Sequence, residues 1–144
     1  MKKYINAHPD AGKAFYQNFH QKGKVVMLNL LKFKATADYS GLDNIKPDRE
    51  LSGKEAYQLY IDLTLPFLEE AGSQLLFMGS SKHFLIGPQE EQWDAVLLVE
   101  HESVHRFMAF AQNKDYLAIA GHRTAALADS RLLPMNTQED HLKL

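Results

Sequence analysis

The chain has 144 residues, 45% hydrophobic and 10% aromatic, which suits a single domain with one hydrophobic core. Sixteen Lys and Arg residues against 18 Asp and Glu give a formal net charge of −2, so no basic excess indicates a nucleic-acid partner. The absence of cysteine excludes disulfides, thiol catalysis and cysteine-based zinc sites. We find no signal-peptide pattern and no run of about 18 apolar residues, and therefore expect a cytoplasmic protein without a membrane partner.

The N-terminal third predicts a helix, a buried strand and a long loop. Residues 9–22 place Phe15 and Phe19 at helical spacing, which indicates a short amphipathic helix. The run "VVMLNLLKF" is apolar on both faces and predicts a buried strand at about 24–33. Residues 34–52 are polar and predict a connection that is longer than usual and therefore often functional.

A second helix is predicted from Ser52 to about Gly72. In "SGKE", Ser52 and Glu55 have the spacing of a capping box at a helix N-terminus. Pro66 lies inside this helix and removes one backbone donor, so we expect a bend or a new segment there. The expected core face consists of Ala56, Tyr60, Leu63 and Phe67.

The second half of the chain predicts two more strands, further helices and a last strand. In the first of these strands, Gly79 and the serines after it indicate a bulge or a strong bend. The order of elements is therefore β-α-β-β-α-β, an α+β ferredoxin-like sandwich with an extra N-terminal helix. The elements are strands at 74–87 and 93–101, a helix capped by Ser103, a helical stretch at 116–128 and a strand at 130–135.

Helices on one face of such a sheet leave its other face bare, yet two of the strands are apolar on both faces. A second copy of the chain, packed sheet to sheet, would bury these surplus apolar rows symmetrically, so we expect a homodimer through the open sheet face. The alternative is that the N-terminal helix or the 34–52 loop covers this face within one chain.

Several segments, taken in order, resemble the family catalogued as domain of unknown function 1330, within the dimeric α+β barrel superfamily. They are "VVMLNLLKF", "SGKEAYQLY", "IGPQEEQWDAVLLVEH" and "SVHRFMAFAQNKDYLAIAGHRTAALADSRLLP". The strongest piece is "DYLAIAGHRTAAL", with Tyr116, His122 and Arg123. The resemblance covers about residues 24–135 and implies a ferredoxin-like homodimer, with no established reaction. Relatives of the same fold include cofactor-independent monooxygenases, lactone isomerases, haem-binding enzymes and small-molecule sensors, and the fold alone does not choose among them.

The expected organisation is a single domain. It consists of a helical leader at 1–23, the ferredoxin-like core at 24–135 and a polar tail at 136–144.

The stretch "HESVH" at 101–105 matches the H-E-x-x-H zinc motif, in which both histidines lie on one face of a helix. Here His101 is predicted at a strand end and Ser103 at a helix N-cap. The two histidines would then not lie one turn apart, so we expect no metal site.

Five polar residues gather in "GHRTAALADSR", among them His122 and Arg123. A histidine that titrates near neutral pH, beside an arginine, could bind a carboxylate or carbonyl oxygen and move a proton. The alternative is structural: Arg123 or Arg131 pairs with Asp129 and joins helix to strand, while His122 lies on the surface.

Asn29 lies in the middle of a strand that is otherwise apolar, and an unpaired buried amide is costly. Three interpretations stay open. Its side chain bonds across the ladder or the dimer seam, satisfies a bulge in the second strand, or points into a pocket between sheet and helices. We favour the first two, because most buried amides are satisfied in place.

These observations predict a small, mostly apolar pocket in each subunit for a small molecule with a carbonyl or carboxylate group. His122 and Arg123 could also convert that molecule without a cofactor, by isomerisation or oxygenation. One alternative is a non-catalytic structural or sensor module, and another is a haem- or metal-dependent enzyme. The expected catalytic residues are His122 and Arg123; the expected binding residues are Asn29, Tyr60, Tyr116 and Arg131.

Overall fold

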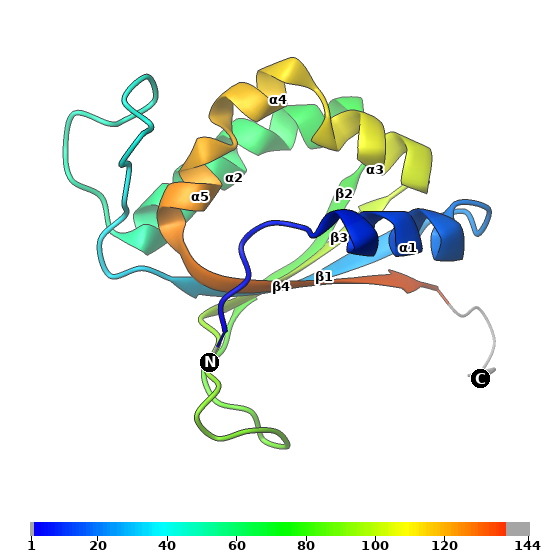
Figure 1. Cartoon of the computed structure of the whole chain (residues 1–144), viewed down its shortest axis with the longest axis horizontal. Helices are drawn as coiled ribbons and strands as arrows, with labels where there is room; N and C mark the ends of the chain where they lie inside the picture. The colour runs from blue at the N-terminus through cyan, green and yellow to red at the C-terminus, as the bar shows by residue number, and fades with distance from the viewer. Residues whose placement is uncertain (1, 138–144) are drawn as a thin grey trace.

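A computed structural model describes residues 2–137 and shows one four-stranded antiparallel sheet with its helices on one face (Figure 1). The strand order β2-β3-β1-β4, with a helical connection after β1 and another after β3, confirms the predicted α+β ferredoxin-like fold. The elements are α1 (Pro9–Phe19), β1 (Val25–Phe33), α2 (Gly53–Glu70), β2 (Gln74–Ser80), β3 (Ala95–His101), α3 (Val104–Ala111), α4 (Lys114–Ile119), α5 (Gly121–Ala126) and β4 (Leu127–Asn136). In this described part, no helix has the length and apolar character that crossing a membrane requires.

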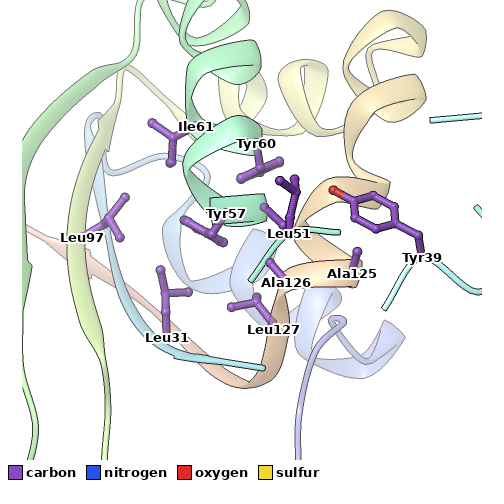
Figure 2. Close-up of a cluster of buried hydrophobic side chains, with 11 residues drawn as sticks. Leu31, Tyr39, Leu51, Tyr57, Tyr60, Ile61, Leu97, Ala125, Ala126 and Leu127 are labelled. Atoms are coloured by element: carbon purple, nitrogen blue, oxygen red, sulfur yellow. The ribbon is translucent and has the colours of Figure 1, made fainter. Parts of the chain in front are cut away.

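The hydrophobic core lies between α2, α5 and the covered face of the sheet (Figure 2). Leu31 of β1 and Leu97 of β3 supply its floor, because alternate residues of a strand point to the same face. Tyr57 and Ile61 of α2 pack on that floor. The side of α5 that faces them consists of small residues, which lets the two helices approach closely.

Helix α2 begins with the predicted capping box. The Ser52 hydroxyl accepts from the Glu55 amide, and the Glu55 carboxylate accepts from the Ser52 amide, both at 3.0 Å. The helix continues through Pro66, so no new segment starts there. The predicted core face is wrong at Leu63, which is 38% exposed, because the buried stripe is rotated. Its members are Ala56, Tyr57, Tyr60, Ile61, Thr64 and Leu68.

The 34–52 loop is fixed on the helix side of the sheet. The Lys34 and Asp38 amides donate to the carbonyl oxygens of Ala126 and Ala125, at 2.8 and 2.9 Å. Helix α1 lies on the same side, where its Phe15 ring packs edge-on against Phe107 of α3. Neither segment covers the opposite face, so the expected alternative of a cover from within the chain is not what the fold adopts.

The second predicted strand is shorter than expected. β2 ends at Ser80, and its bulge falls between Leu75 and Phe77 rather than at Gly79. The apolar residues 84–86 that follow have no neighbouring strand to pair with, because β3 begins only at Ala95. Residues 81–92 instead form a projecting hairpin, which we call the arm, on the side of the sheet away from the helices (Figure 1).

The face of the sheet without helices, called the open face here, carries apolar side chains on all four strands. Pairing in register places side chains of neighbouring strands on the same face, as with Leu28, Leu98 and Leu133. The apolar residues of the open face are Val26, Leu28, Leu30, Phe77, Val96, Leu98, Leu133 and Met135. Two charged residues share this face, Glu100 beside Val26 and Arg131 beside Leu30.

The helical stretch predicted at 116–128 is divided into two short helices. Asn113 caps α4 with its side-chain oxygen, which accepts from the amides of Asp115 and Tyr116. β4 starts at Leu127, earlier than predicted, and ends at Asn136. Of the predicted C-terminal tail, residues 138–144 lie outside the described residues.

Candidate functional site

A cleft of about 480 Å³ lies between α2 and the half of the sheet formed by β2 and β3. Four α2 residues at helical spacing, Lys54, Tyr57, Gln58 and Ile61, form one wall. Phe33, Met78, Gly79, Ser80, Asp94, Ala95 and Leu97 form the rest. Most of these side chains are apolar, as is usual for sites that bind small organic molecules.

Four exposed polar side chains border the cleft: Lys54, Gln58, Ser80 and Asp94. One carboxylate oxygen of Asp94 accepts from the Phe33 amide at 2.8 Å, which fixes this side chain at the end of β1. Among the described residues, no carboxylate forms an ion pair with Lys54. The border of the cleft therefore offers one cation, one anion and neutral groups that donate and accept hydrogen bonds.

Tyr57 is the buried polar residue of the cleft. Burial raises the pKa of its phenol to about 12, although the nearby Arg123 guanidinium lowers it by charge and by hydrogen bonding. At neutral pH the hydroxyl is therefore protonated and can donate a hydrogen bond. Arg123 thus lies behind a cleft residue, although it does not line the cleft itself.

Two of the predicted binding residues meet behind Tyr57. The hydroxyls of Tyr60 and Tyr116 are 2.6 Å apart and share a hydrogen bond between α2 and α4. The Tyr60 ring also contacts the Tyr57 ring, with centroids 5.2 Å apart. Burial raises the Tyr60 pKa well above its ordinary value, with the neighbouring Tyr116 adding to the effect. The Tyr60 hydroxyl is thus protonated at neutral pH, and neither Tyr60 nor Tyr116 lines the cleft.

His122 is buried, with only 5% of its surface exposed, so the expected surface position is wrong. Its Nδ1 and the Tyr39 hydroxyl are 2.7 Å apart and share a hydrogen bond. Burial lowers the pKa of His122, so its ring is neutral near pH 7. The structure places this residue against the 34–52 loop and not in the cleft.

Both arginines have partners within the chain. Arg123 donates to the Ile5 carbonyl oxygen at 2.8 Å and to the Ser130 hydroxyl at 3.4 Å. Arg131 pairs with Asp129, with Nη1 and Oδ1 2.6 Å apart, as one structural alternative expects. Arg123 therefore joins α5 to the N-terminal segment and to β4, while Arg131 pairs with Asp129 along β4 and also with the Glu91 carboxylate of the arm, 4.0 Å away.

Asn29 lies on the helix-covered face of the sheet, in line with Leu97 and Leu132. Its side-chain amide donates to the Met27 carbonyl oxygen of the same strand at 3.3 Å. This bond crosses no strand boundary, and Asn29 is not part of the cleft wall.

The H-E-x-x-H stretch does not form one helix. His101 ends β3, and the Ser103 hydroxyl caps α3 by accepting a hydrogen bond from the Arg106 amide. The His101 Nδ1 lies 2.8 Å from the Ser73 hydroxyl, with the ring packed on Phe107 and Phe110. Residues 2–137 contain no cluster of three or more potential metal ligands.

None of the polar cleft residues belongs to the predicted set, because they come from three separate segments: α2, the end of β2 and the residue before β3. One signal was present on α2. Lys54, Tyr57, Gln58 and Ile61 repeat at i, i+3, i+4 and i+7, a mixed polar and apolar stripe beside the core face. Nothing in the sequence marks Asp94 or Ser80 as their neighbours.

Comparison with known proteins identifies the family. The family described as domain of unknown function (DUF1330) matches residues 48–135. No curated protein matches the sequence. Two solved structures of RPA0582, a protein of unknown function from Rhodopseudomonas palustris, are each 31% identical to the chain. The methylated form has a TM-score of 0.84, and the match covers 97% of this chain and 98% of that one. The other structure has a TM-score of 0.82, and the match covers 96% of this chain and 99% of that one.

A third solved structure, from Thermobifida fusca, is described as a dimeric ferredoxin-like protein of unknown function. It is 12% identical over 83% of this chain and 95% of its own, with a TM-score of 0.41. The family match over more than half the chain, and the 31% identity over nearly all of it, agree with each other. The chain belongs to the DUF1330 family.

Proposed function

We propose that this protein binds a small organic molecule with an apolar body and a carbonyl or carboxylate group in the cleft between α2, β2 and β3. The observation that supports this proposal most directly is the cleft's composition. An apolar interior, with Phe33, Ile61 and Leu97, is joined to a polar border. Its volume falls in the range of about 300–1,000 Å³ that is usual for such sites.

Lys54 and Tyr57 are the proposed contacts for the ligand's oxygen atoms. Lys54 lies in the first turn of α2, where the helix dipole also favours a negative charge. The Tyr57 hydroxyl remains a donor at neutral pH, because its pKa is about 12. In this proposal Arg123, one of the predicted catalytic residues, positions the Tyr57 hydroxyl and does not itself touch the ligand.

The test is a thermal-shift screen of small carboxylic acids, aldehydes and quinones, followed by calorimetric titration of each hit. We expect Lys54→Ala and Tyr57→Phe each to weaken the binding of a hit by about tenfold, because each variant loses one hydrogen bond or charge contact. The matched control is Lys22→Ala, an exposed lysine far from the cleft, which should bind as the native protein does. Hits that bind both cleft variants with native affinity would contradict the proposed site.

A second candidate function is isomerisation of the bound molecule, which the presence of both Asp94 and Tyr57 in the cleft wall favours. The Asp94 carboxylate would take a proton from the carbon next to a carbonyl group and return it to another carbon. The Tyr57 hydroxyl would stabilise the intermediate by donating to the carbonyl oxygen. Asp94→Asn tests this step, because the amide oxygen can still accept from Phe33 while the base is lost. Unchanged turnover in this variant would refute the role.

We also propose that the protein is a homodimer through its open face. Large apolar faces of a sheet seldom remain in water, and here all the helices lie on the opposite side. Sedimentation velocity should show a dimer that Leu28→Lys, in the middle of the open face, converts into a folded monomer. A native chain that stays monomeric at about 100 μM, a concentration at which interfaces of standard size are saturated, would exclude this proposal.

A further inference from the structure

The arm has an apolar tip that the rest of the subunit does not cover. Leu85 is 100% exposed and Ile86 is 91% exposed, the two highest values among the exposed large apolar residues of the described chain. Single exposed apolar residues are common on protein surfaces, but two adjacent and fully exposed ones at the tip of a projection are not.

The arm has a defined shape. At its base, the Ser81 amide donates to the Asp94 carbonyl oxygen and the Trp93 amide to that of Lys82. Further out, His83 and Gln92 form an isolated bridge between the two limbs. At the tip, the Phe84 ring packs over Gly87, where a Cβ atom would lie 2.7 Å from the ring. Phe84 is thus turned back against the arm, and the two residues after it point outward.

The direction of the arm indicates its partner. It projects on the side of the sheet where the open face lies, away from every helix (Figure 1). A second sheet packed on the open face would occupy the space beside the arm. A two-fold axis through that interface would place each arm alongside the other subunit.

The size of the open face supports the same partner. Strands of 9, 7, 7 and 10 residues form the sheet. At about 3.3 Å per residue and about 4.8 Å between strands, such a sheet covers about 500 Å². A stable interface buries about 800 Å² on each partner. The open face alone is therefore small for a stable dimer, and the arm supplies additional apolar surface on the same side.

We propose that the arm, residues 81–92, clasps a second copy of this chain and buries Leu85 and Ile86 against it. The inference rests on the homodimer described under the proposed function, and it adds a second, separate part to that interface. The two parts can fail independently, because the open face and the arm are changed by different substitutions.

The test is sedimentation velocity of the full chain over a concentration series. The double variant Leu85→Ser, Ile86→Ser should raise the dimer dissociation constant by at least about 100-fold, since four buried side chains are lost per dimer. Leu117→Ser is the matched control, a 54% exposed leucine on α4, and should leave the constant unchanged. A double variant that dimerises like the native chain would refute the proposed contact of the arm with the second copy, while leaving the homodimer through the open face in place. A native chain that is monomeric throughout would refute both.

A second measurement does not depend on the stability of the double variant. The chain has no cysteine, so Leu85→Cys introduces a single thiol. Its reaction with a maleimide should be at least tenfold slower in the dimer than in a Leu28→Lys background, because the clasp covers it. Equal rates in the two backgrounds would overturn the inference. So would binding to phospholipid vesicles that the double variant loses while its dimerisation is unaffected, since the tip would then face a lipid surface.

Discussion

The hydroxyl of Tyr39 and Nδ1 of His122 are 2.7 Å apart and join the 34–52 loop to α5. Both residues are buried, and their rings also meet edge to face, with centroids 5.5 Å apart. This loop is therefore part of the packed structure on the helix side and not a mobile connection.

Tyr39→Phe should lower the free energy of unfolding by about 1–3 kcal/mol, because it leaves a buried imidazole nitrogen without its partner. The measurement is urea denaturation followed by circular dichroism. Tyr16→Phe, which changes an exposed tyrosine on α1, should stay within about 0.5 kcal/mol of the native value. Equal stability of the native protein and Tyr39→Phe would show that the hydrogen bond contributes nothing net.

Two glycines in helices should respond in opposite directions to alanine. At Gly53, a Cβ atom would overlap the Lys34 carbonyl oxygen and lie 2.7 Å from that of Ala126. Both are backbone atoms that cannot turn aside, so Gly53→Ala should cost about 3 kcal/mol or more. Gly12 in α1 has open space around it, and Gly12→Ala should stabilise the protein by about 0.5–1 kcal/mol. Thermal unfolding of both variants checks the pair, and a destabilised Gly12→Ala would contradict the account.

The fold could be predicted from the sequence largely because its signals are local. The Ser52 and Glu55 capping box, and the continuous apolar runs of β1 and β3, each depend on a few neighbouring positions. The arm could not be predicted in the same way. Residues 84–87, "FLIG", are as apolar as a buried strand. Only the start of β3 at Ala95 shows that they have no neighbouring strand to pair with.

The candidate site was less predictable than the fold, because its residues are brought together by contacts between distant positions. His122 lies on a short helix and is buried because the 34–52 loop folds over it, a contact between positions 83 residues apart that no local pattern reveals. The polar residues of the cleft come from α2, β2 and the start of β3, and no local pattern brings them together. Sequence patterns thus identified residues with suitable chemistry, whereas the packing decided which of them border a cavity.

His101 should make the protein's stability depend on pH. Burial lowers its pKa from 6.5 to about 4 in the folded protein. Between these values the unfolded chain takes up a proton and the folded chain does not. The free energy of unfolding should therefore be highest above pH 6.5 and should fall as the pH drops toward 4.

His101→Phe should flatten that part of the curve, measured by urea denaturation at several pH values. His122 remains in both proteins, so its own contribution cancels in the comparison. The control is His105→Gln, an exposed histidine on α3, which should keep the native slope. If His101→Phe also kept the native slope between pH 6.5 and 4, the lowered pKa of His101 would be disproved.

Arg131 should contribute more to stability than an ordinary surface arginine. Its guanidinium lies over the Trp93 and Tyr4 rings, 5.0 and 4.8 Å from their centroids, and pairs with the buried Asp129. Burial raises the pKa of Asp129, but hydrogen bonds from the Tyr4 amide and from Arg131 outweigh that effect and hold it below its usual value. Arg131→Met should therefore cost about 2–3 kcal/mol, because it leaves a buried carboxylate without its cation.

The matched control for that substitution is Arg49→Met. Arg49 also pairs with a carboxylate, that of Glu55 at 3.2 Å, but both of these side chains are exposed to water. Exposed pairs contribute about 0–1 kcal/mol, so this variant should unfold at nearly the native urea concentration. Circular dichroism should follow both variants, because the fluorescence of Trp93 would itself change when Arg131 is removed. Equal losses in the two variants would mean that burial of Asp129 and stacking on Trp93 add nothing to the ion pair.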